Sequence, residues 1–587
     1  MKHIGSSQSV QRICAIVVIS LGLGRSTPAN ATRHEVFALS PTPALLDRAN
    51  QGMVTSAHPL ATQAGLSMLQ QNGNAVDAAV ATTFAISVVE PFSAGIGGGG
   101  FLLMYQAKNN ETRALDFRER APLNATRTMY LNQQGNVRPN ASTNGYLAVA
   151  TPGTIAGLYE MHRQYGRLPW KTVIAPAIQL AEVGFPVSWR FVDATRMRQQ
   201  TLLKNPDARK IFTHEGALYR PGDRLVQSEL AATLRSVSQN PKSFYTGSIA
   251  AAIANDMVAN NGLITQKDLQ QYRPTWRDPA CGDFRKARVC SMPPPSSGGV
   301  HLLQILNMVG DTDLKAMGWH NPDALHLLVE SMRIAYADRA TYLGDPDFIK
   351  VPVKALISPI YAQKRRREIN PQKATPSSQV KAADPAVLQR LTKESVETSH
   401  LTVVDRDRNA VSLTFTVNLG FGSGVVAKGT GIVLNNEMDD FAIAPNTPNA
   451  FGLVGGDANA IAPNKIPLSS MTPTIVTQNG HLRLATGSPG GSRIITTVLQ
   501  IVLNVLVYEM DVRQAVAAPR VHHQWLPDRL NVELWGLDTL TVAELKRRGH
   551  QIEERSDWGN ANAIVVLPDG SLEGAADPRG EGVAAGF

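Results

Sequence analysis

Two short segments, residues 398–404 and 410–418, alternate between apolar and polar side chains with a period of two. That period is typical of strands with one buried face. A polar run at 405–409, centred on Asp407, separates the segments and predicts a turn. A hairpin that is symmetric about Asp407 places Thr398 opposite Thr416, within reach of a cross-strand contact. The pattern therefore predicts a hairpin that brings two threonine hydroxyls together.

The two faces of this predicted hairpin differ in chemistry. The polar face carries Thr398, His400, Thr402, Thr414, Thr416 and Asn418, and the apolar face carries Leu401, Val403, Val411, Leu413, Phe415 and Val417. On pattern alone, the polar face is typical of a sheet surface in contact with solvent. The alternation by itself assigns no chemistry to the hydroxyl groups.

The rest of the chain predicts helices and strands in both halves. Residues 59–71 and an Ala/Val-rich run at 74–89 predict helices, residues 155–257 are mostly helical in pattern, and 492–507 predicts an apolar helix. Strands are expected at 101–105, 431–434 and 482–486. Four glycines at 97–100 lack the Gly-Lys-Ser/Thr sequence of a phosphate loop, so we interpret them as sites of close backbone packing. Periodicity alone predicts only a mixture of α and β structure.

Two segments have the composition of loops. Residues 370–396 are polar, contain three prolines and lack periodicity. This predicted mobile loop ends directly before Thr398. Residues 446–456 are rich in Gly and Asn and predict a second loop.

Length and charge narrow the classes of function. The 587 residues, 43% of them apolar, suit a soluble globular enzyme with a large core. The net charge of +9 is scattered along the chain, apart from a basic run at 364–367. We interpret that run as a solvated helix end and expect no nucleic-acid partner. The mild positive charge is compatible with an anionic small-molecule substrate.

The first 31 residues have the pattern of a signal peptide. Lys2 and Arg12 precede an apolar run at 13–23, and Ala29-Asn30-Ala31 offers a cleavage site of the A-x-A type. The alternative is an uncleaved amphiphilic tail. The run is too short to cross a bilayer and no later segment is long enough, so we expect a periplasmic or secreted protein without a membrane span.

Two cysteines, Cys281 and Cys290, remain after the predicted leader. They flank eight residues that predict two short strands around a turn. In an exported protein this arrangement favours a disulfide over two free thiols.

Several motifs, in one order along the chain, resemble the γ-glutamyltranspeptidase family. They are Leu115-Asp116-Phe117-Arg118-Glu119, residues 292–299 (MPPPSSGG), 336–339 (YADR), 342–348 (YLGDPDF), 397–400 (ETSH), 435–441 (NNEMDDF), 467–471 (PLSSM) and 487–493 (GSPGGSR). The resemblance implies an α+β N-terminal-nucleophile hydrolase fold, a four-layer αββα sandwich. It also implies cleavage between Glu397 and Thr398 into a large subunit (32–397) and a small subunit (398–587) that share one core. No cofactor is implied.

The resemblance makes Thr398 the nucleophile. A threonine hydroxyl needs a base, and the α-amine of an N-terminal threonine, with a reference pKa of about 7.7–8.0, is such a base. That amine exists only after the chain is cut. The resemblance implies that the cut is autocatalytic, with the Thr398 hydroxyl attacking the Glu397 carbonyl. Thr416 would orient the Thr398 hydroxyl.

The resemblance also assigns the substrate-binding residues. Gly490 and Gly491, which could be a simple helix-entry turn, become the oxyanion hole. Arg118, Ser469 and Ser470 would bind the α-carboxylate of a γ-glutamyl group, and Asn418, Glu437 and Asp440 would bind its α-ammonium. The implied activity is cleavage of glutathione and other γ-glutamyl compounds through a Thr398 ester, with transfer to water or to amino acid or dipeptide acceptors. The alternatives are a related glutaryl- or cephalosporin-type acylase and, of another class, an inactive exported binding protein.

Three positions depart from the family pattern or invite another interpretation. Many bacterial members have Gln where this chain has Glu437, and Phe451 stands where members with a lid often have Tyr. A Phe cannot supply a hydroxyl latch, so lid closure is open to question. We interpret His400 as structural because the α-amine already fills the role of base. His522-His523 and Asp439-Asp440 lack metal-ligand spacing, and we expect no metal.

Overall fold

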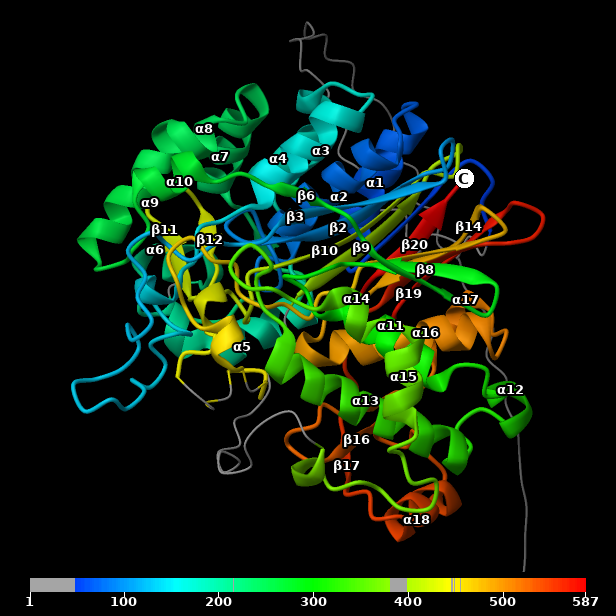
Figure 1. Ribbon diagram of the computed structural model, residues 1–587. Helices are drawn as coiled ribbons and strands as arrows, with labels where there is room; N and C mark the ends of the chain where they lie inside the picture. The colour runs from blue at the N-terminus through cyan, green and yellow to red at the C-terminus, as the bar shows by residue number, and fades with distance from the viewer. Residues whose placement is uncertain (1–47, 215, 381–397, 445–446, 448, 454) are drawn as a thin grey trace, which may run out of the picture. The chain divides into compact units, whose positions relative to one another are not determined.

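The structure, a computed structural model, describes residues 48–587 apart from 215, 381–397, 445–446, 448 and 454 (Figure 1). The described residues all belong to one compact unit, Leu45–Phe587. The predicted leader and Glu397 lie outside the described residues. The predicted processing junction is therefore described only from Thr398 onward, and the subunit boundaries stay predictions.

Two antiparallel sheets lie face to face at the centre of this unit. The seven-stranded sheet has the order β20 (Val583–Gly586), β1 (Met53–Ser56), β9 (Ser399–Val404), β10 (Ala410–Thr416), β2 (Gly99–Gln106), β3 (Glu111–Phe117) and β6 (Thr275–Arg277). The six-stranded sheet has the order β19 (Leu572–Ala576), β18 (Asn562–Val566), β14 (His481–Gly487), β13 (Thr474–Gln478), β8 (Ala287–Ser291) and β7 (Ala280–Phe284). Both sheets combine strands from before and after residue 398.

Helices cover the outer face of each sheet. On one side, α1 (Pro59–Gln70) and α2 (Ala75–Val89) pack on β1, β9 and β10; on the other, α11 (Gly298–Val309) and α16 (Ile494–Leu506) pack on β7, β8 and β14 (Figure 1). α13 (Pro322–Tyr342) packs against α11. The layers are therefore αββα, as predicted.

The remaining elements surround these layers. The middle of the chain is helical, as expected, with α3 (Thr154–Tyr165), α4 (Trp170–Val183), α5 (Trp189–Leu202), α6 (Pro206–Phe212), α7 (Ser228–Gln239), α8 (Ser243–Thr246), α9 (Ser248–Ala259) and α10 (Gln266–Gln271). The other helices are α12 (Leu314–Met317), α14 (Val353–Leu356), α15 (Pro359–Arg366), α17 (Val512–Ala517) and α18 (Thr539–Arg547). Short strands are β4 (Phe185–Pro186), β5 (Arg224–Leu225), β11 (Val425–Ala427), β12 (Ile432–Leu434), β15 (Val521–His522), β16 (Leu530–Glu533) and β17 (Ile552–Arg555). No helix among the described residues is long and apolar enough to cross a membrane.

The central hairpin has the predicted register. β9 pairs with β10 so that Ser399 lies opposite Phe415 and Val403 opposite Val411, which places Thr398 opposite Thr416. The polar face, however, is not solvated, because it packs against the second sheet. Its hydroxyls find partners there: Ser412 Oγ donates to the Thr486 carbonyl (2.9 Å) and Thr402 Oγ1 to the Asn562 carbonyl (3.2 Å). The interpretation of this face as a solvated surface is wrong.

The glycines before and within β2 allow the chain to pass close to the hairpin. A side-chain carbon at Gly98 would come within 1.9 Å of the Thr416 carbonyl oxygen, and one at Gly100 within 2.3 Å of the Thr414 carbonyl oxygen. This confirms the expectation of close backbone packing. The contact lies at the end of β10 where Thr416 is placed.

The basic run at 364–367 is only partly a solvated helix end. Lys364 and Arg367 are exposed, but Arg365 is buried. Arg366 donates to the carbonyls of Met308 (2.9 Å) and Val309 (2.7 Å) at the end of α11. Two of the four basic side chains therefore serve internal contacts.

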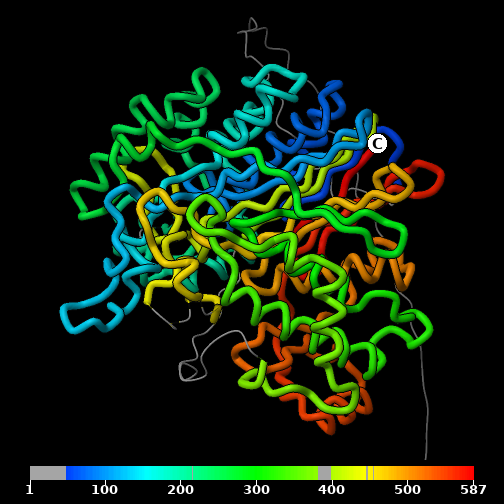
Figure 2. Tube along the Cα trace, viewed as in Figure 1, coloured from blue at the N-terminus to red at the C-terminus, as the bar shows by residue number. Residues whose placement is uncertain are grey.

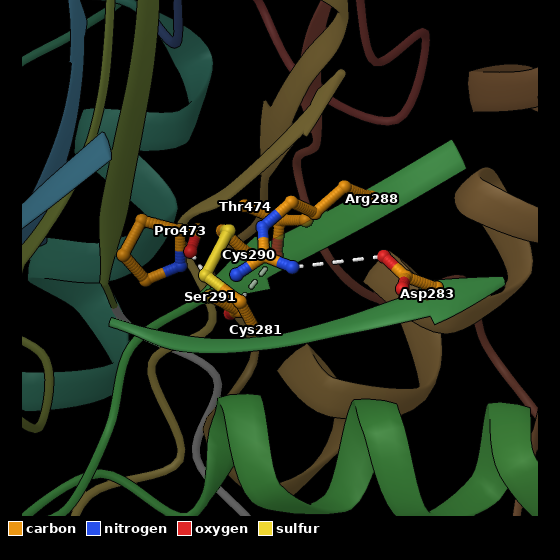
Figure 3. The surroundings of a disulfide bond; sticks show 7 residues. All are labelled: Cys281, Asp283, Arg288, Cys290, Ser291, Pro473 and Thr474. Atoms are coloured by element: carbon orange, nitrogen blue, oxygen red, sulfur yellow. Dashed lines mark hydrogen bonds and ion pairs between the residues drawn. A yellow bond between two sulfur atoms is a disulfide. The ribbon is translucent and has the colours of Figure 1, made fainter. Parts of the chain in front are cut away.

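Cys281 and Cys290 form a disulfide, as the sequence favoured (Figure 3). They lie directly opposite each other on β7 and β8. The same hairpin carries an ion pair between Arg288 and Asp283 (3.6 Å), and Ser291 Oγ donates to the Pro473 carbonyl (2.9 Å). The bridge thus ties the edge strand of the six-stranded sheet to its neighbour.

Candidate active site

One pocket collects almost all of the predicted site residues. Its walls include Thr398, Thr416, Asn418, Arg118, Glu437, Asp440, Ser469, Ser470 and Gly491, together with Arg339, Phe451, Leu453, Leu468, Met471 and Ile494. These residues come from eight separate stretches of sequence. Of the predicted residues that the structure describes, Gly490 alone does not line the pocket, although it adjoins Gly491.

The two threonine hydroxyls meet in this pocket. Thr398 lies immediately before β9, and its Oγ1 is 3.2 Å from the Oγ1 of Thr416 at the end of β10. The Thr416 oxygen also accepts a hydrogen bond from the backbone N–H of Asn418 (2.8 Å). Asn418 itself has a φ of 77°, in the left-handed region that Asn tolerates, so the chain turns directly after β10. The backbone thus positions Thr416, which in turn positions the Thr398 hydroxyl.

His400 has no nitrogen directed into the pocket. Its Nδ1 lies 2.8 Å from Thr414 Oγ1 and its Nε2 3.1 Å from Thr402 Oγ1. Burial lowers the pKa of His400 to about 3, so the ring is neutral at physiological pH. These contacts agree with the interpretation of His400 as a structural residue between the sheets.

Arg118 forms two close ion pairs at the floor of the pocket. It follows β3, is fully buried, and lies 2.5 Å from Glu437 Oε1 through Nη1 and 2.5 Å from Asp440 Oδ2 through Nη2. Glu119 is 3.9 Å from the same guanidinium. The predicted carboxylate anchor and two of the predicted ammonium acceptors therefore contact each other, which the sequence did not indicate.

Two of the carboxyl groups beside the Arg118 guanidinium, Glu119 and Glu437, have raised pKa values. Burial, only partly offset by Arg118, raises the pKa of Glu119 to about 7. Burial raises the pKa of Glu437 well above its ordinary range for the same reason. Glu119 and Glu437 therefore release a proton less readily than exposed carboxyl groups do.

Ser469 and Ser470 are held by the stretch 292–299. The backbone N–H and Oγ of Ser297 both donate to the Ser469 carbonyl (2.9 and 2.8 Å), and the Ser469 N–H donates to the Pro295 carbonyl (2.9 Å). Nearby, Asp345 Oδ2 accepts a hydrogen bond from the backbone of Ile466 (2.8 Å). Two motifs from before residue 398 thus brace a loop from after it, a role that the sequence alone did not reveal.

Gly490 and Gly491 lie where a tight turn enters α16. Their φ angles, 135° and 55°, are in the region that favours glycine. A 3₁₀ turn, Gly491–Arg493, then leads into the helix, so the predicted helix begins two residues later than expected. A side-chain carbon at Gly491 would come within 2.4 Å of the Phe451 ring, which covers this glycine.

The loop that carries Phe451 is tied to the acidic turn of the pocket. Asn449 Nδ2 donates to Asp440 Oδ1 (3.1 Å), and the Ala450 N–H donates to Asp439 Oδ2 (2.8 Å). Phe451 itself is buried, and its carbonyl accepts a hydrogen bond from Gln524 (3.4 Å). These contacts hold the aromatic ring over Gly491 without a tyrosine hydroxyl.

The pocket also contains a residue that sequence reasoning missed. Arg339 lies on the last turn of α13 and faces the pocket beside Ser470. The Tyr-Ala-Asp-Arg motif at 336–339 belongs to the family resemblance, but the resemblance assigns it no role in the site. That motif is the feature of the sequence from which Arg339 could have been proposed as a site residue.

The fold and the position of Thr398 place the protein in the N-terminal-nucleophile hydrolase class. A solved cephalosporin acylase from Bacillus halodurans has the same architecture, with a TM-score of 0.82 and 30% identity over 95% of this chain and 99% of that one. A solved gamma-glutamyltranspeptidase chain from Helicobacter pylori is 43% identical, with a TM-score of 0.56, over 60% of this chain and 99% of that one.

The chain belongs to the gamma-glutamyltranspeptidase family, whose model matches residues 61–587. It is 48% identical over 534 residues to the glutathione hydrolase proenzyme of Escherichia coli K12, covering 91% of each chain. The resemblance inferred from the motifs is therefore confirmed.

Proposed function

We propose that this protein is an exported γ-glutamyltransferase and glutathione hydrolase that matures by cutting itself between Glu397 and Thr398. The observation that carries the proposal is the contact between the Thr398 and Thr416 hydroxyls inside a pocket that also holds Arg118, Asn418 and Asp440. Family membership and the relationship to glutathione hydrolase proenzymes support it. The leader 1–31 would direct the protein to the periplasm or the medium.

Maturation would begin with the Thr398 hydroxyl oxygen attacking the Glu397 carbonyl carbon. The C–N bond breaks, the Thr398 nitrogen takes up a proton as a free amine, and an ester joins Glu397 to Thr398 Oγ1. Water hydrolyses the ester and releases the Glu397 carboxylate. The products are a large subunit, 32–397, and a small subunit that begins at Thr398 with both a nucleophile and a base.

In turnover, the Thr398 amine would remove the hydroxyl proton as Oγ1 attacks the γ-carbonyl carbon of the substrate. The N–H groups of Gly490 and Gly491 would stabilise the oxyanion, since they stand at a helix entry with no side chain in the way. The departing amine takes the proton, leaving a γ-glutamyl ester on Thr398. Water, an amino acid or a dipeptide amine then attacks this ester.

The charged groups of the pocket suit a γ-glutamyl substrate. Its α-carboxylate would lie against Arg118 and the hydroxyls of Ser469 and Ser470, and its α-ammonium against Glu437 and Asp440. Asn418 Nδ2 donates to the Asn436 carbonyl (3.0 Å), which leaves the amide oxygen of Asn418 as an acceptor for the ammonium.

The competing function is a glutaryl- or cephalosporin-type acylase, favoured by the likeness to the B. halodurans acylase. The test compares hydrolysis of γ-glutamyl and glutaryl p-nitroanilides, which differ only in the α-ammonium. We expect a preference for the γ-glutamyl compound, because the ammonium meets acidic groups that glutaryl leaves unpaired. A preference for the glutaryl anilide would identify an acylase, and a single uncut, inactive chain would indicate a binding protein.

A further inference from the structure

Arg339 is a buried cation without a matching anion. It is 4% exposed, and no carboxylate of a described residue lies within ion-pair distance of its guanidinium. By contrast, Arg333 on the same helix pairs with Glu330 (3.0 Å). Burial lowers the pKa of Arg339 to about 10, so the group is still charged at neutral pH. A buried charge without a counter-charge is costly, and strongly perturbed ionisable groups cluster at functional sites.

The contacts of Arg339 point it at the serines of the pocket. Its Nε donates to Ser297 Oγ (3.1 Å), and its Nη2 lies 3.4 Å from Ser470 Oγ. Ser297 in turn holds the carbonyl of Ser469. The guanidinium therefore lines the pocket beside the Ser470 hydroxyl, next to the predicted position of the substrate α-carboxylate.

Arg118, the other cation that lines the pocket, already contacts carboxyl groups of the protein. Both terminal nitrogens of Arg118 contact carboxylates, Glu437 and Asp440, and Glu119 is close by. An incoming substrate carboxylate would therefore meet a guanidinium whose terminal nitrogens already contact carboxyl groups. Arg339 is the second guanidinium that lines the pocket, and it lies on the side of Ser470.

We propose that Arg339 is a second cationic residue for the substrate α-carboxylate and sets specificity for carboxylate-bearing acyl groups. The carboxylate lies between Arg118 and Arg339, with Ser469 and Ser470 beside it. The inference rests on the proposed function, since it deepens the assignment of that same subsite. It also gives the stretch 336–339 a chemical role.

The test uses three p-nitroanilides that differ in one group each: γ-glutamyl, glutaryl (no ammonium) and 4-aminobutyryl (no carboxylate). In Arg339→Gln, kcat/KM should fall about 10- to 100-fold for the first two, mainly through KM, which is what losing a hydrogen bond to a charged group costs. The 4-aminobutyryl compound should change by less than about twofold. Arg339→Lys should fall between wild type and Arg339→Gln.

Arg365→Gln is the matched control, because Arg365 is buried near the same helix, pairs with Glu368 (3.1 Å) and does not line the pocket. It should leave the ratios between the three substrates unchanged. An equal loss on all three substrates in Arg339→Gln, or no loss on the γ-glutamyl compound, would overturn the proposal. If Arg339→Gln does not fold, the same three ratios in Arg339→Lys decide the question.

The wild-type enzyme separates this inference from the proposed function. Turnover of the γ-glutamyl anilide by the wild type tests the function, and the substrate ratios of the variants then test Arg339 alone. If the wild type prefers the glutaryl anilide, the proposed function fails while the dependence on Arg339 can still hold. If it turns over neither carboxylate-bearing compound, both proposals fall.

Discussion

Replacing Glu119 with Gln should make the protein more stable at neutral pH and change how stability depends on pH. Glu119 is fully buried, 3.9 Å from Arg118, and shares that one cation with Glu437 and Asp440. Burial raises its pKa from an ordinary 4.5 to about 7. The folded protein therefore binds this proton more tightly than the unfolded chain does.

Proton linkage sets the direction and the size of this change in stability. A raised folded-state pKa means that the favourable contribution is fully present below pH 4.5 and is lost as the pH rises through about 7. The free energy of unfolding falls by about 1.4 kcal/mol for each pH unit between 4.5 and about 7, so the total loss is about 3 kcal/mol. A protein of this size has an unfolding entropy that converts about 1 kcal/mol into about 1 °C, so the melting temperature should fall about 3 °C through this group alone.

The assay measures melting temperature from pH 4.5 to pH 8 for the parent and for Glu119→Gln, both in a Thr398→Ala background that keeps the chain uncut. The amide cannot ionise, so the two curves should start together and separate by about 3 °C at neutral pH, with the variant higher. Asp577→Asn is a control of opposite sign, because Arg520 and Arg579, outweighing burial, lower the pKa of Asp577. In that variant the deficit should stay constant from pH 4.5 to pH 8, because it shrinks only as the pH falls below 3.8. Parallel curves for the parent and Glu119→Gln would refute the charge argument.

Three further outcomes are expected. Thr398→Ala should give a folded, uncut and inactive chain, whereas Thr398→Ser should still cut itself and keep some activity. Intact mass and N-terminal sequencing report the cut, and anilide hydrolysis reports the activity. An active chain that is intact across residues 397–398 would contradict the mechanism. Arg118→Ala should raise KM for the γ-glutamyl anilide by the roughly 2–5 kcal/mol that a lost buried charge partner costs, while self-cleavage persists, and an unchanged KM would contradict the assignment. Phe451→Tyr should shift product from hydrolysis toward transfer by at most roughly tenfold, the value of one hydrogen bond, when both products are quantified with a dipeptide acceptor. An unchanged product ratio would mean that the existing contacts of Phe451 already close the loop.

Local pattern was enough to predict the hairpin and the disulfide. The period of two and the symmetric polar turn set the register of Thr398 and Thr416, because a hairpin's pairing follows from its turn. The same logic placed Cys281 opposite Cys290 on neighbouring strands. In both cases the partners are close in sequence, so no knowledge of distant segments was needed.

Features that depend on distant segments could not be predicted from local pattern. The polar face of the hairpin is buried because strands around Thr486 and Asn562 lie against it, and alternation cannot tell a neighbouring sheet from water. The contact of Arg118 with Glu437 and Asp440 joins residues more than 300 positions apart. Family motifs named these residues, but they did not show that the three form one cluster with Glu119.

The arrangement of the sheet explains how a cut at 397–398 could leave the core intact. β9 lies between β1 and β10, and β10 lies between β9 and β2, so both strands of the hairpin after residue 398 pair with strands from before it. In Figure 2 the blue trace of the first part of the chain runs alongside the yellow-green trace of this hairpin. The proposed cut breaks one backbone bond and none of these ladders. The pocket is divided in the same way: the cations Arg118 and Arg339 precede the cut, while the hydroxyls and the acidic groups Glu437 and Asp440 follow it. Neither predicted subunit contains the whole pocket, so we expect the sheet to assemble before the proposed cut frees the Thr398 amine. A protein that separates into two folded, independent subunits after cleavage would contradict this order of events.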